Sequence, residues 1–244
     1  MATQLLFYEN AVPLAASRHA DWSVEPRDFS FSRTSTSVPL MAVEFPVAAE
    51  EYAIVFVGQP GEIVPVAITG VRPNENLFLD AAGGWDAKYI PGFVRRYPFV
   101  FTTADGGDTL TLCIDEAYPG INQEGRGQRL FDEQQKPSTF TNQVMEFLRD
   151  YQVEYGRTQA FCRKLEELKL LEPMQVEIGT PGAPSSLGGF MGVDREKMRA
   201  LKGAKLAELA KDDSLEMIYV HLQSLRNFGR MRGRMEARQA AAKA

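Results

Sequence analysis

The 244-residue sequence has only two cysteines and two histidines. Cys113 and Cys162 cannot supply the disulfide framework of a small secreted domain, so we expect two buried thiols. The longest wholly apolar run, residues 52–57, is far shorter than a membrane-spanning helix requires. The N-terminal residues also lack the basic and apolar regions of a signal peptide. We therefore expect a cytoplasmic protein without a membrane span.

An excess of positive charge is missing as well. The 27 Lys and Arg residues against 32 Asp and Glu residues give a net charge of −5. Because binding to phosphate backbones needs a cationic surface, this balance argues against a general nucleic-acid-binding protein. The glycine-containing segment 182–189 lacks the lysine of a phosphate-binding loop. A hydrophobic content of 44% and a charged content of 24% are ordinary for a globular protein with a substantial core.

The first half of the chain carries the signals of short antiparallel strands. Residues 1–50 contain four prolines after position 12 and predict an irregular wrapping segment with edge strands. Strands are predicted at 52–57, 64–69 and 77–80, separated by turn residues. A hairpin follows, with strands at 99–102 and 109–115 joined by an Asp-Gly-Gly-Asp turn.

The second half is predicted to be mainly helical. Ser138 or Thr139 can cap a helix whose apolar spacing continues to about Leu168, with a possible interruption at Gly156. Two short strands, 174–178 and 190–193, form a small β excursion. Asp194 is expected to cap the next helix, and Asp213 with Glu216 resembles a capping box for a last helix over 214–238.

These patterns predict an α+β fold, with an antiparallel β-rich N-terminal part and a helical C-terminal part that contains the small β excursion. The loop-like segment 117–137 places the boundary between a β-rich domain, 1–136, and a mainly helical part, 137–244. The alternative is one intermingled domain in which residues 174–193 add strands to the first sheet.

Aromatic and charged residues between positions 85 and 116 form the candidate ligand site. Arg95 and Arg96, near Asp115 and Glu116, predict a polar pocket inside aromatic walls that suits a carboxylate or peptide ligand. Of the two readings we favour the alternative, a structural ion pair that fixes the turn against the hairpin, because such pairs occur without any ligand. The candidate ligand-binding residues are Trp85, Tyr89, Phe93, Arg95, Arg96, Tyr97, Asp115 and Glu116.

The two histidines raise a metal alternative. His19 and Asp21 have the H-x-D spacing of two facial-triad ligands, and His221 would be the distant third. We expect instead that His221 is hydrogen-bonded at the interface with the preceding helix and that the three residues do not converge. No metal site, cofactor or catalytic residue is predicted.

The whole chain resembles the SapC-like family of bacterial proteins. The resemblance is carried by AVPLAASRHADWSV, VPLMAVEFPVAAEEYAIVF, NLFLDAAGGWDAKYIPGFVRRYPFVF, LTLCID, RLFDEQQKPS and MIYVHLQSLRNFGR. Membership implies no catalytic residue. It implies an association with surface layers, from which the family takes its name, or protein partners of the flavin-dependent halogenase-like and cupin-like kinds.

The leading functional hypothesis is a non-catalytic accessory or binding protein that assists peptide or aromatic-compound modification and uptake. One alternative is a structural component associated with a surface layer. The other is a metal-dependent oxygenase that uses the H-x-D and distant His site.

Overall fold

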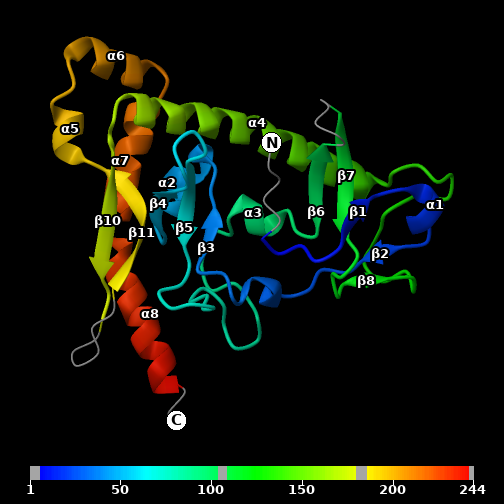
Figure 1. Ribbon diagram of the computed structural model, residues 1–244. Helices are drawn as coiled ribbons and strands as arrows, with labels where there is room; N and C mark the ends of the chain where they lie inside the picture. The colour runs from blue at the N-terminus through cyan, green and yellow to red at the C-terminus, as the bar shows by residue number, and fades with distance from the viewer. Residues whose placement is uncertain (1–5, 104–108, 180–185, 242–244) are drawn as a thin grey trace. The chain divides into compact units, whose positions relative to one another are not determined.

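The structure is a computed structural model that describes residues 6–103, 109–179 and 186–241 (Figure 1). These residues form two compact units, and each unit combines two separate stretches of the sequence. Unit 1 contains residues up to 31 together with 94–153, and unit 2 contains 32–93 together with 154 onward. The predicted α+β class is confirmed, with antiparallel sheets toward the N-terminus and helices toward the C-terminus. The predicted boundary near residue 136, between a β-rich domain and a mainly helical part, stays a prediction.

Unit 1 contains two small antiparallel sheets. The predicted hairpin is present as β6 (Phe99–Thr103) and β7 (Leu110–Asp115), and β1 (Ala11–Pro13) adds to the other edge of β7. The second sheet has the order β8-β2-β9, with β8 at Ile121–Asn122, β2 at Ser23–Val24 and β9 at Gln128–Arg129. The short helix α1 (Ala16–His19) lies between β1 and β2 in the sequence.

The core of unit 1 joins its two sheets to a helix. Its buried side chains come from both sheets, from the loops after β7 and β9, and from α4 (Thr139–Glu167): Val24, Phe99, Ile114, Tyr118, Leu130, Phe131 and Leu148. Gly127 permits a close approach beside this core, since a Cβ atom there would lie 2.3 Å from the Val24 carbonyl oxygen. Its φ of +80° also favours glycine.

Unit 2 is organised around a five-stranded antiparallel sheet of order β10-β11-β4-β5-β3. The strands are β3 (Ser37–Pro39), β4 (Ala53–Val57), β5 (Val64–Ile68), β10 (Leu171–Glu177) and β11 (Ser186–Val193). The β excursion predicted at 174–193 therefore pairs with the strands of the first half of the chain. Burial on both faces explains the uninterrupted apolar run of β4.

Short helices complete unit 2. They are η2 (Ala42–Glu44), α2 (Phe45–Ala48), α5 (Arg195–Arg199), α6 (Gly203–Lys211), α7 (Ser214–Ser224) and α8 (Asn227–Ala241). Figure 1 shows α7 and α8, in orange and red, beside the β10–β11 hairpin. Phe190 of β11 stacks on Phe228 of α8, with ring centroids 5.8 Å apart.

Two connecting elements, η1 (Ser30–Ser32) and α3 (Gly92–Arg95), lie where the chain passes between units. The helix α4 is one continuous element, and its residues up to 153 belong to unit 1. Ser138 caps it by accepting the Thr141 amide at 3.1 Å. No helix of the described residues combines the length and apolar character needed to cross a membrane.

Several local predictions are wrong. Residues 77–80 form no strand, and Leu79 makes only an isolated bridge to Trp85. Gly156 does not interrupt α4, because a single glycine is tolerated within a long, packed helix. The last predicted helix is divided into α7 and α8.

The predicted capping box at Asp213 is absent. Asp213 has a left-handed backbone with φ of 61°, and its side chain accepts no capping hydrogen bond. The preceding residue, Asp212, accepts the Ser214 amide instead, at 3.2 Å. The predicted Asp194 cap is confirmed, since its carboxylate accepts the amides of Glu196 and Lys197.

Candidate functional site

A cavity of about 240 Å³ lies within unit 1. Its wall is formed mainly by aromatic and aliphatic side chains, and three of the lining residues are arginines. The lining residues are Val24, Pro26, Arg27, Phe29, Phe31, Val94, Arg95, Arg96, Tyr97, Pro98, Phe99, Tyr118, Phe140, Val144 and Phe147. We call this the arginine-aromatic cavity.

Three segments that are distant in sequence, together with Tyr118 of the loop after β7, form its wall. Residues 94–99, which lead from α3 into β6, contribute one side. On α4, Phe140, Val144 and Phe147 are spaced at four and three residues and therefore share one helix face. Residues 24–31, which follow β2, contribute the third side. The cavity is thus a product of tertiary packing.

The two neighbouring arginines of the wall differ in burial. Arg96 is 8% exposed, and its guanidinium carbon lies 5.1 Å from the Tyr151 ring centroid and 5.9 Å from that of Tyr8. Arg95 is exposed, and its guanidinium lies 5.2 Å from the Phe147 ring centroid. A guanidinium stacked on an aromatic face keeps its N–H donors in its own plane, directed away from that face. The rings therefore orient both cations.

Tyr97 connects the cavity to the polar cluster behind it. Its ring lies 4.4 Å from that of Phe31, and its hydroxyl donates to the Asp115 carboxylate at 3.1 Å. Burial raises the pKa of Tyr97, and the nearby Asp115 carboxylate raises it further. The hydroxyl therefore remains a neutral donor at every physiological pH.

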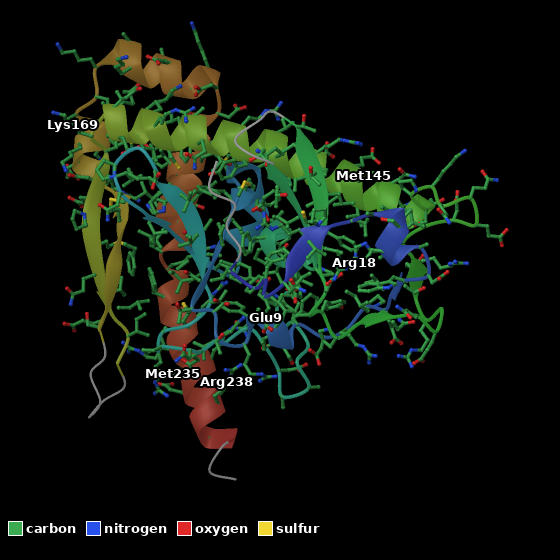
Figure 2. All side chains as sticks on the ribbon, turned by 45° about the vertical axis from the view of Figure 1, so that its right-hand side comes forward. Glu9, Arg18, Met145, Lys169, Met235 and Arg238 are labelled. Atoms are coloured by element: carbon green, nitrogen blue, oxygen red, sulfur yellow. The ribbon has the colours of Figure 1, made fainter. Side chains whose placement is uncertain are left out.

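The predicted acids Asp115 and Glu116 serve mainly to hold the N-terminal segment. Buried Asp115 accepts the amides of Glu9 and Asn10 at 2.9 Å and the amide of Ala117 at 3.1 Å. Glu116 forms an ion pair with Arg18 at 2.5 Å, and its other carboxylate oxygen lies 3.1 Å from His19 Nε2. Neither acid lines the arginine-aromatic cavity. Figure 2 shows Arg18 extending from α1.

The other three candidates belong to unit 2. Trp85 Nε1 donates to the Tyr52 hydroxyl at 2.8 Å, and that hydroxyl donates to the carbonyl of Tyr89 at 2.5 Å. The Tyr89 hydroxyl donates to Glu44 at 2.6 Å, and Phe93 is fully buried. The structure thus places Arg95, Arg96 and Tyr97 in the cavity wall of unit 1, with Asp115 bonded to Tyr97 outside that wall. Trp85 and Tyr89 belong to a hydrogen-bond network of unit 2, and Phe93 is buried in that unit.

The three metal candidates also divide between the units. His19 is buried in unit 1 between the amide of Ala15, which donates to Nδ1, and the Glu116 carboxylate. Asp21 is exposed. His221 belongs to unit 2. Within the part of the chain that the structure describes, no group of three or more His, Cys, Asp or Glu side chains is arranged to hold a metal ion.

His221 connects two strands, which corrects the expectation of a contact with the preceding helix. Its Nδ1 lies 2.9 Å from the Ile54 carbonyl oxygen of β4, and its Nε2 accepts the Val193 amide of β11 at 3.0 Å. These partners require a neutral ring protonated at Nδ1. Desolvation by burial lowers the pKa of His221 to about 4, although the Ile54 hydrogen bond opposes that shift. The ring therefore stays neutral at pH 7.

Among the described residues of unit 2, two hollows of about 440 Å³ each have polar lining groups that already bond to protein groups. One is lined by Arg33, Arg234 and Arg238, among others. Arg234 pairs with Asp86 at 2.6 Å. Arg238, labelled on α8 in Figure 2, donates to the Leu79 carbonyl. The other is lined by β10, β11 and Gly58, and none of its described lining residues is charged. In the smaller cavity of unit 1, Arg95 and Arg96 lie beside the aromatic rings of the same unit, and this cavity is the candidate ligand site.

The part of the cavity wall that lies outside residues 85–116 was not predicted from the sequence. The α4 face was visible only as a core stripe, because its spacing is the same for core packing and for a cavity wall. Phe29 and Phe31 lie in the segment predicted as an irregular wrap with edge strands, and they line the cavity, with Phe31 inside η1. No pattern in the sequence links these segments to Arg95.

Comparison with known proteins gives one match. The model of the SapC family matches residues 14–231, nearly the whole chain. No curated protein and no solved structure matches the chain.

Proposed function

The chain belongs to the SapC family, and we propose that it is a non-catalytic accessory protein that binds a small aromatic ligand in the arginine-aromatic cavity. The observation that carries this proposal is the composition of the cavity wall. Five phenylalanines and two tyrosines line it, which suits an aromatic ring through apolar burial and edge-to-face contacts.

The volume of the cavity limits the ligand. An engineered cavity of about 150 Å³ holds benzene, and pockets for drug-sized ligands begin at about 300 Å³. At about 240 Å³ the cavity lies between these values. One ring with a short substituent fits, whereas a dinucleotide cofactor does not. The ligand is therefore a single aromatic side chain or a small aromatic compound.

An accessory role agrees with the other features of the proposal. A protein that holds an aromatic group would act beside the halogenase-like or cupin-like partners implied by the resemblance, which would carry out the chemistry. A cytoplasmic location is part of this proposal, and the two buried free cysteines support it. Fractionation of native host cells tests the location, and abundant protein on the intact cell surface would favour the surface-layer alternative.

Binding is tested with phenylacetate and its uncharged amide, phenylacetamide, by ligand-observed NMR and calorimetry. We expect at least one of the two to bind with a Kd of about 1 mM or tighter. Val144→Trp places an indole in the cavity and should abolish binding. Val153→Trp is the matched control, since Val153 lies on the same helix, is 54% exposed and does not line the cavity.

Two results would overturn the proposal. One is a complete lack of binding of both compounds to the folded wild-type chain. The other is equal binding by the Val144→Trp and wild-type proteins. Mass spectrometry of the recovered compounds checks the non-catalytic part, because any product formed by the purified chain would contradict it.

A further inference from the structure

The charged residues around the cavity bear on the charge of the ligand as well as on its aromatic ring. Arg27, Arg95 and Arg96 all line the arginine-aromatic cavity, and its described lining residues include no Asp or Glu. The buried acid Asp115, which bonds to the cavity residue Tyr97, lies outside that lining and accepts three backbone amides and the Tyr97 hydroxyl. A wall with three cations and no anion favours a negatively charged ligand.

The three arginines are not equivalent. Arg27 is exposed and pairs with Glu25 at 2.8 Å, so a local acid offsets its charge. Arg96 is 8% exposed, and a guanidinium kept from water interacts with an anion more strongly than an exposed one does. Arg95 is exposed beside Phe147 and is accessible to an incoming ligand.

We propose that the ligand is an aromatic carboxylate whose ring lies among the phenylalanines of the cavity and whose carboxylate pairs with Arg95 in the positive field of Arg96. This inference rests on the proposed function and adds the charge of the ligand to it. A carboxylate matches the planar guanidinium, which can donate two parallel hydrogen bonds. The rings of Phe147 and Tyr151 hold the two guanidinium groups in orientation before the ligand arrives.

The test compares three ligands that share one ring: phenylacetate, phenylacetamide and 2-phenylethylamine. We expect the wild-type full-length chain to bind phenylacetate at least about tenfold more tightly than phenylacetamide, because a charge-assisted hydrogen bond is stronger than a neutral one. The amine should bind most weakly. Added salt should weaken the binding of phenylacetate and leave that of phenylacetamide nearly unchanged.

Arg95→Gln should remove the preference for the acid while leaving phenylacetamide binding unchanged. Arg149→Gln is the matched control, since Arg149 is exposed on α4 and does not line the cavity. Arg96→Gln is the second variant, used after its fold has been checked by circular dichroism, and it should also reduce the preference.

The outcomes separate the two proposals. If phenylacetate and phenylacetamide bind equally tightly, the cavity binds rings but the assignment of charge is wrong. If the preference for the acid persists in both Arg95→Gln and Arg96→Gln, the carboxylate does not pair there and the inference also fails. If neither ligand binds, the proposed function itself fails.

One further arm identifies the source of the carboxylate. The peptide Gly-Gly-Gly-Phe is compared with its C-terminal amide. Binding of the free-acid peptide as tightly as phenylacetate would identify a C-terminal aromatic residue of a peptide as the ligand. Exclusion of the peptide, with retained binding of phenylacetate, would identify a free small acid. Each result supports the aromatic carboxylate and names where it comes from.

Discussion

Glu44 of unit 2 and Arg96 of unit 1 are both buried charged side chains, 7% and 8% exposed, but their surroundings differ. Glu44 accepts the amides of Met41 and Gly92, each at 2.7 Å, and the Tyr89 hydroxyl at 2.6 Å. Arg96 lies between aromatic rings at the wall of a cavity. The acid is enclosed by protein donors, whereas the cation is placed beside space that a ligand can enter.

Other buried polar groups of unit 2 resemble Glu44, because they also bond to protein groups. Asn227 donates to the carbonyls of Ala49 and Tyr52, both at 2.8 Å, and the Ser224 hydroxyl oxygen accepts the Ile54 amide at 3.0 Å. These contacts fix helices α7 and α8 to the strand β4 and the segment before it. A buried polar group therefore indicates a functional site only when its surroundings leave room for a partner.

The largest effect on stability is expected from a substitution that breaks the hydrogen-bond network around Glu44 in unit 2. Glu44→Ala leaves two buried amides and a tyrosine hydroxyl without their acceptor, and should lower the free energy of unfolding by about 3–5 kcal/mol. Urea denaturation measures it. Exposed Glu50→Ala is the control and should change the value by less than about 0.5 kcal/mol. A small effect at Glu44 would mean that the network is not a stabilising feature.

The next prediction uses the neutral histidine of unit 2. The pKa of His221 falls from 6.5 to about 4 on folding, so the unfolded chain binds more protons between those values. Its contribution to stability is complete above pH 6.5 and is lost as the pH falls toward 4, a change of about 3 kcal/mol.

His221→Leu serves as the reference for this effect, because other groups also titrate in that range. The variant should be less stable at pH 7, and the difference in unfolding free energy from the wild type should shrink as the pH falls. A difference that stays constant from pH 7 to pH 4 would show that the ring does not need to be neutral.

The smallest effect concerns the two arginines of unit 1. Arg96→Ala should cost about 2 kcal/mol through lost packing on Tyr8 and Tyr151, and Arg95→Ala less than about 1 kcal/mol because Arg95 is exposed. Thermal and urea unfolding measure both. If Arg95→Ala were the more destabilising, Arg95 would be a structural residue, and its proposed role in binding would weaken.

The predictable parts of the fold were those encoded by local patterns. The pairing of β6 with β7 was predicted from the Asp-Gly-Gly-Asp sequence at 105–108, a predicted turn that lies outside the described residues. The start of α4 was predicted from Ser138 followed by apolar spacing. The break between α7 and α8 had no such signal, because no glycine or proline lies between Ser224 and Asn227. There, Ser224 and Asn227 turn inward to bond to the segment 49–54, a tertiary contact that overrides local propensity.

The candidate site was predictable only where its residues are neighbours in sequence. Arg95, Arg96 and Tyr97 were predicted as candidate residues because they lie in one short aromatic segment, and all three line the cavity. The acids expected beside the arginines bind the N-terminal segment through Glu9, Asn10 and Arg18, about 100 residues away. Contacts over such a separation leave no periodic signal.

The interleaved order of the two units has a consequence for synthesis on the ribosome. In unit 2, β4 ends at Val57 but its neighbour β11 begins only at Ser186. At about 5–20 residues per second, the apolar edge of β4 is made roughly 6–26 s before the strand that covers it. The nascent chain therefore carries an exposed strand through most of its translation, and a chaperone that shields such edges should raise the yield of this protein more than its final stability would suggest.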